Sequence, residues 1–492
     1  MGKAASRRLT RRAIQLAVLA DSACLAVILG FTAYAVSVLP DLQPWHTERL
    51  RGEFSAPLDS QLDFAGYLEL ESRLFEAARQ ADTSWGDSGY GYAYSRFNAA
   101  SPIQKLAEGA PYNRSFRLTP TTPVGGALLV HGLTDSPYSM KALADSLYPR
   151  GFEVTVLRLP GHGTLPSMMT EVHYRDWKAA VRLAAQDVAA RTGPGQPFYV
   201  GGYSTGASLV LNFALDSLDE KELRRPDRVL LMSPAIELTR VAALANIIDV
   251  LSIVPIPVLE KVRWQEILPK YDPYKFNSFP VNAARQVNQA TKKLQAALQS
   301  AEDGGRLAQL PPVVTWQSVV DSTVGSGGTV DRLYARLQGG RHRLVIFDVN
   351  RFLGYASMQR PAARQLIDRA IATHPGYTLE VVSNVSAAPF VEPLDLAWPN
   401  DGVSLGHVSL PFPPDDPLYG FLPGSGRNGV PSLGSRLLRG ESGALTISLG
   451  SLTRLRSNPF WGLIDAQVGD LVAADSAGAA QNGEPVGLRV DE

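Results

Sequence analysis

Residues 198–215 read Phe-Tyr-Val-Gly-Gly-Tyr-Ser-Thr-Gly-Ala-Ser-Leu-Val-Leu-Asn-Phe-Ala-Leu, with Gly202-Tyr203-Ser204-Thr205-Gly206 at their centre. The apolar run before this motif predicts a strand, and residues 207–215 after it predict a helix. A sharp turn between a strand and a helix strains its central residue and lifts that side chain above the sheet edge, and the flanking glycines let the two elements approach. We therefore interpret Ser204 as a candidate nucleophile; the alternative is a chance G-x-S-x-G in a chain with 43 glycines.

From residue 115 onward, apolar segments alternate with helical segments. Near-continuous apolar strands are typical of sheets that helices cover on both faces, so the alternation predicts an α/β fold with a mostly parallel sheet and right-handed crossovers. The predicted strands are 115–119, 127–131, 153–158, 198–202, 228–232, 313–319, 343–347 and 378–382, and the predicted helices are 139–148, 177–191, 208–218, 329–337 and 362–373.

Residues 235–311 interrupt this alternation and are interpreted as a helical cap insertion. Within them, residues 241–262 are mainly apolar. This run predicts either a helix buried in the core or a cap whose apolar face covers the active site and forms an acyl pocket. A cap that contacts a membrane is a third interpretation.

Two further motifs accompany the serine turn: His131-Gly132-Leu133-Thr134-Asp135-Ser136-Pro137 and Leu159-Pro160-Gly161-His162-Gly163. With Gly202–Gly206 they closely resemble the α/β-hydrolases related to bacterial carboxylesterases and monoacylglycerol lipases. The resemblance is strong over residues 127–234 and weaker around Asp321 and His407. It implies an α/β-hydrolase fold in which a serine, an acid and a histidine follow one another along the chain.

The acid of such a triad comes from a loop after a late strand. Asp321 lies just past the predicted strand 313–319, and Asp348 ends the next strand as its rival. Three histidines follow Asp321. His342 stands between two arginines, where a solvated edge position is expected, and His374 lies at a helix end, where a capping or solvated role is expected.

His407 lies in an irregular stretch, from which an imidazole can reach between a serine and an aspartate. By resemblance, Ser204, Asp321 and His407 form the catalytic triad. The unusually long separation between Asp321 and His407 departs from the family pattern. The backbone N–H groups of Leu133 and Thr205 are the predicted donors of an oxyanion hole.

His131 is interpreted as a structural hydrogen-bonding residue, because it precedes the serine and ends a strand. The scattered histidines show no metal-ligand spacing, and neither a P-loop nor a dinucleotide fingerprint is present. No metal or organic cofactor is expected.

The first twelve residues carry five Lys or Arg and no acid, and residues 13–39 are mainly apolar. This pattern predicts a signal anchor that spans a membrane and leaves the following chain outside the cytoplasm, on the periplasmic or extracellular side. A signal peptide cleaved near Ala35 is the alternative. A lipoprotein anchor on Cys24 and a twin-arginine signal fit less well.

The predicted organisation is therefore a basic tip with a transmembrane helix (1–40), a linker with an N-terminal helical extension (41–111), the hydrolase domain (112–475) and a disordered tail (476–492). Lys plus Arg equals Asp plus Glu at 47 each, which gives no support for nucleic-acid binding. The expected substrate is a small-molecule or lipid ester.

The leading interpretation is a membrane-anchored or exported serine hydrolase of carboxylic esters. An acyltransferase or a peptidase with the same triad, and a non-catalytic binding protein with this fold, are the alternatives.

Overall fold

A computed structural model describes residues 40–85, 101–107, 111–237, 260–319, 326–348, 361–383, 391–393, 410–420, 422, 426–427, 430–431 and 457–482, except 269, 271, 338, 340, 374, 375 and 459, together with isolated residues at 15–30 and 93–100. The predicted signal anchor at 13–39 lies almost entirely outside the described residues. Among the described residues, no helix has the length and apolar character needed to cross a membrane.

One sheet organises the described part of the chain, and its nine strands follow the order β1-β3-β2-β4-β5-β8-β9-β10-β11. All neighbouring strands pair in parallel except β1, which pairs antiparallel with β3. The strands are β1 (Phe116–Leu118), β2 (Gly125–Val130), β3 (Phe152–Leu157), β4 (Phe198–Tyr203), β5 (Arg228–Met232), β8 (Val313–Ser318), β9 (Arg343–Phe347), β10 (Thr378–Ser383) and β11 (Val391–Pro393). The predicted mostly parallel α/β sheet is confirmed.

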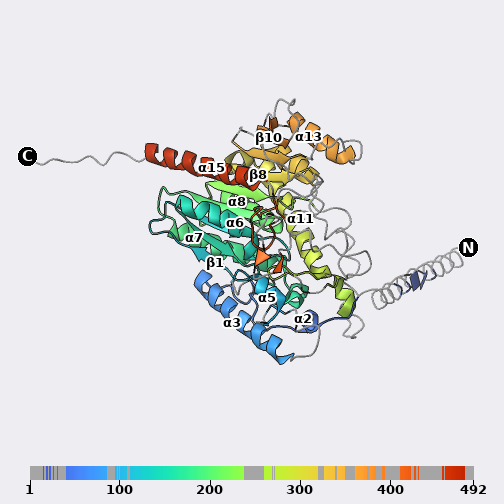
Figure 1. The fold of residues 1–492 in the computed structure, drawn as a ribbon. Helices are drawn as coiled ribbons and strands as arrows, with labels where there is room; N and C mark the ends of the chain where they lie inside the picture. The colour runs from blue at the N-terminus through green and yellow to red at the C-terminus, as the bar shows by residue number, and fades with distance from the viewer. Residues whose placement is uncertain are drawn as a thin grey trace, which may run out of the picture.

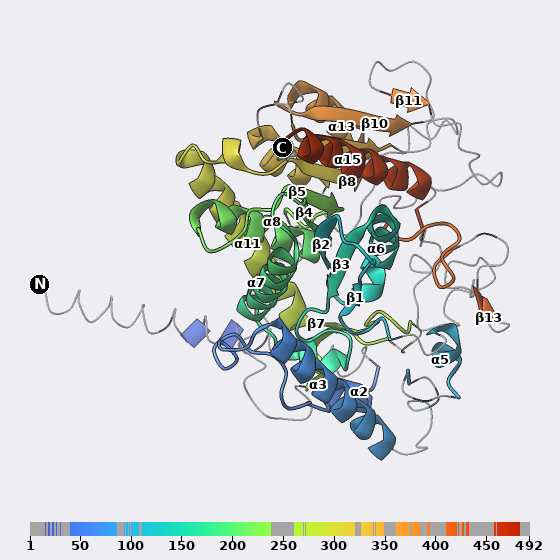
Figure 2. The same cartoon turned by 90° about the vertical axis from the view of Figure 1, so that its left-hand side faces the viewer.

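Helices cover both faces of this sheet, as Figures 1 and 2 show. One face packs against α7 (Tyr174–Arg191), α8 (Thr205–Asp219), α11 (Val281–Asp303) and α13 (Pro361–Thr373). The other face packs against α6 (Lys141–Leu147) and α15 (Trp461–Asn482). The central strands β2, β3, β4 and β8 are buried along almost their whole length, because side chains on both of their faces meet a helix layer.

Helix α3 (Phe64–Ser84) precedes the sheet. The shorter elements are α2 (Pro44–Thr47), α5 (Pro102–Ala107), α12 (Ser326–Gly328), the π-helical turn Thr329–Leu333, the hairpin β6 (Trp264–Glu266) and β7 (Phe279–Pro280), and the pair β12 (Gly426–Arg427) and β13 (Val430–Pro431). Turns of 3₁₀ helix lie at Pro137–Met140, Tyr148–Arg150, Pro166–Thr170, Lys261–Arg263, Leu307–Gln309 and Tyr334–Arg336.

The insertion predicted at 235–311 is not a cap throughout. Its last part forms α11, whose Val287, Leu294 and Leu298 join the main core beside α8. Helix α11 is thus the helix of the crossover between β5 and β8, and residues 281–303 were wrongly included in the predicted cap. Residues 241–259 of the predicted apolar run lie outside the described residues, so neither interpretation of that run is tested.

The N-terminal extension packs against the hydrolase domain, where the sequence indicated a linker. Trp45 and Phe54 are buried, and Glu53 accepts a hydrogen bond from the N–H of Gly161 at 2.8 Å. The fully buried Arg158 guanidinium lies 2.9 Å from Glu53 and 3.1 Å from Glu71 of α3. The interpretation as a linker is wrong for these residues, because their partners lie about a hundred positions further along the chain.

The C-terminal helix α15 extends into the predicted disordered tail. It runs to Asn482, and its Asp475 carboxylate accepts hydrogen bonds from the Arg228 guanidinium and the Tyr199 hydroxyl at the amino ends of β5 and β4. The start of the predicted disordered tail, at 476, therefore lies within a helix. Residues 483–492 are outside the described part of the chain.

Candidate active site

Ser204 forms the turn between β4 and α8, with φ 53° and ψ −115°. Few residues other than glycine adopt a positive φ, and such strained positions cluster at functional sites. The strain is held in place by the backbone, because the Ser204 N–H donates to Met232 O at 3.0 Å and the Ala235 N–H donates to Ser204 O at 3.0 Å. The end of β5 thus fixes the turn.

The two glycines of the motif are required by close backbone contacts. A Cβ on Gly202 would lie 2.4 Å from the carbonyl carbon of Gly206, and a Cβ on Gly206 would lie 2.1 Å from Val130 O. The Gly202 contact brings β4 close to α8, as the sequence indicated, and the Gly206 contact brings the start of α8 close to the end of β2.

The Ser204 side chain is half-buried. Among the described residues, its hydroxyl has no hydrogen-bond partner. The predicted base His407 lies outside the described residues.

The two predicted oxyanion donors lie next to Ser204. Thr205 is the first residue of α8, where N–H groups have no acceptor inside the helix. Gly132 lies against the serine, since a Cβ on Gly132 would be 3.2 Å from Ser204 Cβ. Leu133 follows it, and its N–H meets no acceptor in the described part of the chain. Within the part of the chain that the structure describes, neither N–H group has an acceptor, as the predicted role requires.

His131 is fully buried beside this loop. Its Nδ1 lies 2.8 Å from Gly132 O, and its Nε2 accepts from the Leu159 N–H at 3.0 Å. This pattern places the proton on Nδ1 and leaves Nε2 as the acceptor. Burial lowers the pKa of His131 to about 3, so the ring is neutral. Both ring nitrogens are engaged, which fits the structural role that the sequence indicated.

His342 does not lie at a solvated edge, and that expectation is wrong. The side chain is fully buried, Nδ1 accepts from the Val313 N–H at 3.1 Å, and burial lowers its pKa to about 4. The flanking arginines were misleading, because the ring turns inward between β8 and β9. Val313 starts β8, so His342 lies at the amino edge, roughly 20 Å by strand length from the carboxyl edge that carries Ser204.

Asp321, His374 and His407 lie outside the described residues. The strand before Asp321 ends at Ser318 and stands two positions from β4 in the sheet, about 10 Å away at ordinary strand spacing. The rival Asp348 is buried directly after β9, one strand further from β4. The ends of these two strands, Ser318 and Phe347, lie on the same edge of the sheet as Ser204.

Residues 410–420, named here the return segment, resume the described chain three positions after His407. Phe412, Leu418 and Tyr419 are buried in a cluster with Tyr138 and Tyr274. Residues 131–138, the oxyanion loop, contribute Tyr138. The prolines and aspartates of the return segment are typical of a loop, and its partners are distant along the chain. The aromatic residues Phe412 and Tyr419, which are unusual in a stretch rich in turn-forming residues, are the sequence feature that could have indicated its burial.

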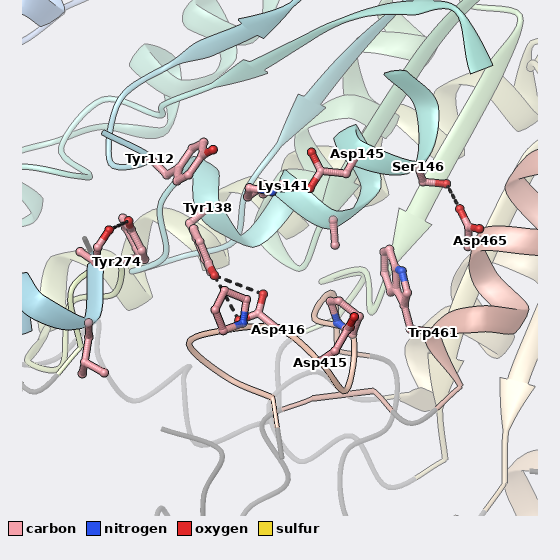
Figure 3. A pocket seen from close by; sticks show the side chains of 15 residues that line it. Tyr112, Tyr138, Lys141, Asp145, Ser146, Tyr274, Asp415, Asp416, Trp461 and Asp465 are labelled. Atoms are coloured by element: carbon pink, nitrogen blue, oxygen red, sulfur yellow. Dashed lines mark hydrogen bonds and ion pairs between the residues drawn. The ribbon is translucent and has the colours of Figure 1, made fainter. Parts of the chain in front are cut away.

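A cavity of about 580 Å³ lies beside α6 and the start of α15 (Figure 3). Its lining includes Tyr112, Tyr138, Lys141, Trp461 and Asp465, and Ser204 is not part of it. The cavity is therefore separate from the nucleophile. In the described part of the chain, no three His, Cys, Asp or Glu side chains gather as metal ligands would.

A model of the alpha/beta hydrolase family matches residues 127–397, more than half of the chain. A curated relative, the thermostable monoacylglycerol lipase of Bacillus sp. (strain H-257), is 38% identical over 89 residues, which cover 18% of this chain and 34% of that lipase. The chain thus matches about a third of the length of this relative.

Solved structures are similar at lower identity. The monoacylglycerol lipase of Paleococcus ferrophilus is 17% identical with a TM-score of 0.35, covering 52% of this chain and 98% of that chain. A soluble variant of monoglyceride lipase from Saccharomyces cerevisiae, in complex with a substrate analog, is 15% identical with a TM-score of 0.34, covering 48% and 82%. At TM-scores this low, these two similarities support no conclusion about the activity or the site of this chain. The family match confirms the resemblance that the motifs indicated: the chain belongs to the alpha/beta hydrolase family.

Proposed function

We propose that the chain is a serine hydrolase that cleaves carboxylic esters, of the esterase or lipase type, through an acyl-enzyme on Ser204. The observation that carries the proposal is the strained Ser204, beside the N–H groups of Leu133 and Thr205, which meet no acceptor among the described residues. The relationship to a monoacylglycerol lipase supports an ester of an acyl chain as the substrate.

In the proposed reaction, Ser204 Oγ attacks the ester carbonyl carbon while His407 takes the hydroxyl proton. The carbonyl oxygen becomes an oxyanion, which the N–H groups of Leu133 and Thr205 stabilise. The C–O bond to the alcohol then breaks, and His407 returns the proton to the leaving oxygen. Water repeats both steps on the acyl-enzyme, while Asp321 orients the imidazole and stabilises its charged form.

His407 is the proposed base because the other histidines fit less well. His46, His131, His162 and His342 are buried, and His173 is the exposed N-cap residue of α7. Thr373, directly before His374, bonds to Tyr377 at the amino end of β10, on the edge opposite Ser204. Leu410, three residues after His407, is buried, and three residues of chain reach at most about 11 Å.

Asp321 is the proposed acid, and Asp348 is its rival. Replacing each by asparagine separates them. We expect Asp321→Asn to lower kcat by about 10⁴-fold, as a triad aspartate does, and Asp348→Asn to leave most of it. The reverse order would assign the acid to Asp348.

A fluorophosphonate probe tests the function directly, because it reacts only with an activated serine. We expect the purified chain to be labelled, with labelling lost in Ser204→Ala and retained in Ser72→Ala, which removes an exposed serine of α3. An unlabelled wild-type protein would favour the non-catalytic binding protein. Products formed with and without an added alcohol or amine distinguish a hydrolase from an acyltransferase, and amide substrates test for a peptidase.

We also propose that residues 13–39 anchor the chain in a membrane with the hydrolase domain outside the cytoplasm. Its support is the apolar run and its basic flank. The full chain should stay with membranes after alkaline carbonate washing, and a chain that begins at residue 40 should not. Release of both proteins by the wash would contradict the anchor. If the protein expressed from the full chain is found shortened by about 35 residues, the signal peptide is cleaved near Ala35.

A further inference from the structure

We propose that two tyrosine–aspartate hydrogen bonds, Tyr138–Asp416 and Tyr419–Asp272, form a junction that positions the oxyanion loop and the return segment for catalysis. The inference rests on the proposed function and deepens it. The junction joins three stretches that are distant in sequence: the oxyanion loop (131–138), residues 272–276 (the cap segment) and the return segment (410–420).

The first bond joins the oxyanion loop to the return segment. The Tyr138 hydroxyl donates to Asp416, 3.1 and 3.2 Å from its two carboxylate oxygens, and Figure 3 shows this side chain pointing at Asp416. Asp416 is buried and also accepts the N–H groups of Leu418 and Tyr419, both at 2.8 Å. One carboxylate thus folds the return segment into a turn and binds that turn to Tyr138.

The second bond repeats this arrangement between the return segment and the cap segment. The Tyr419 hydroxyl donates to Asp272 and lies 2.9 Å from both of its oxygens. Asp272 is buried and accepts the N–H groups of Tyr274 at 2.9 Å and Lys275 at 3.1 Å. Again a carboxylate shapes its own turn and receives a tyrosine from another segment.

The cap segment also contacts the oxyanion loop, so the three stretches form one closed network of contacts. The Phe276 N–H donates to Thr134 O at 2.7 Å, and Lys275 Nζ lies 2.9 Å from Asp135 Oδ1. The rings of Tyr138 and Tyr274 stack with centroids 4.2 Å apart and planes 7° apart. Each of the three stretches therefore contacts the other two.

This network of contacts fixes the orientation of the Gly132–Leu133 peptide, which carries the predicted oxyanion donor. The carbonyl of Gly132 and the N–H of Leu133 belong to one planar peptide and point in opposite directions. The carbonyl accepts from His131 Nδ1 at 2.8 Å and from the Asp135 N–H at 3.3 Å. Because Asp135 and Thr134 are held by the cap segment, the direction of the Leu133 N–H depends on the junction.

The burial of the junction supports a positioning role. Tyr138, Asp272, Asp416 and Tyr419 are all at least nine-tenths buried. Buried carboxylates are unfavourable unless they are fully hydrogen-bonded, and an apolar replacement often gives equal stability. Directional bonds at this point fix a geometry that apolar packing would leave looser.

The test measures kcat and KM separately in Tyr138→Phe, Tyr419→Phe and the double variant of the full chain, on a p-nitrophenyl ester. An oxyanion donor acts in the transition state, and its complete loss lowers kcat by about 10²–10³-fold. We expect each single variant, which only displaces the donor, to lower kcat roughly tenfold with KM nearly unchanged. The kcat of the double variant should be similar to that of each single variant, because both bonds belong to the same network of contacts and their effects are not additive.

Tyr199→Phe is the matched control. It removes a tyrosine–aspartate bond of the same kind, to Asp475, at the amino end of β4 and away from Ser204. We expect it to keep the wild-type kcat. Thermal unfolding of all variants shows whether the protein is folded at the assay temperature.

Three results would overturn the inference. The first is a kcat in both junction variants equal to that of Tyr199→Phe. The second is a rise in KM alone, which would instead indicate that the cavity lined by Tyr138 binds substrate. The third is a loss of activity that follows unfolding. If wild-type protein reacts with the fluorophosphonate and turns over, these results reject only the junction, whereas an unreactive wild-type protein rejects the proposed function as well.

Discussion

Replacing Gly132 by alanine should damage catalysis without unfolding the protein. The added Cβ would lie 2.8 Å from Asp135 Oδ2, 3.0 Å from Tyr203 Cδ1 and 3.2 Å from Ser204 Cβ, whereas ordinary contacts begin at 3.4 Å. Relief of the shortest contact requires about 0.6 Å, from 2.8 to 3.4 Å, and Asp135 cannot swing away freely because Lys275 holds it. The oxyanion loop and the serine therefore have to move apart.

A displacement of 1 Å at reacting groups lowers the rate by about 10²-fold. We therefore expect kcat of Gly132→Ala to fall between about 10- and 100-fold, with a smaller change in KM, because the oxyanion contacts form in the transition state. The rate of reaction with a fluorophosphonate should fall in parallel.

Gly462→Ala is the matched control. Gly462 lies near the start of α15, and no atom stands within 4 Å of an added Cβ. Alanine is the better helix former by about 1 kcal/mol, so this variant should keep its activity and lose no stability. A Gly132→Ala protein that retains kcat within about twofold of Gly462→Ala would refute the placement of the loop against Ser204.

Two further predictions concern stability. Burial lowers the pKa of four histidines, to about 3 for His46, His131 and His162 and about 4 for His342. Their rings are neutral in the folded chain, whereas in the unfolded chain they become protonated below about pH 6.5. The free energy of unfolding should therefore fall as the pH drops from 6.5 toward 4, by at most about 1.4 kcal/mol per pH unit for each ring. Denaturant titrations that give the same stability at pH 7 and pH 5 would contradict this prediction. Arg158→Met leaves the buried carboxylates of Glu53 and Glu71 without their cation and should cost about 3–5 kcal/mol in urea unfolding. Arg79→Met breaks only the exposed pair with Glu76 and should leave the stability nearly unchanged. Equal losses in the two variants would contradict the burial of the Arg158 cluster.

The features that could be predicted from sequence are those with local causes. The turn at Ser204 is recognisable because the strand, the Gly-x-Ser-x-Gly motif and the helix follow one another within a few residues of chain. The strands were recognisable because burial on both faces demands continuous apolar runs. Features of this kind depend on neighbouring residues, so they can be recognised in the sequence.

The errors have non-local causes. Glu53 lies in a proline-containing, charged stretch that is typical of linkers, and only its distant partner Arg158 makes it part of the fold. His342 was placed at the surface because of its arginine neighbours, although its ring turns inward. Tyr138 and Asp416 are 278 positions apart, so nothing near either one predicts their bond.

The rate of ester hydrolysis by His407→Ala, beside His374→Ala as its matched control, tests the central claim most directly. If His407 is the base that activates Ser204, kcat should fall by about 10⁴–10⁶-fold in His407→Ala and stay near wild type in His374→Ala. A His407→Ala protein with near-normal activity would contradict the account, and loss of activity in His374→Ala instead would assign the base to His374.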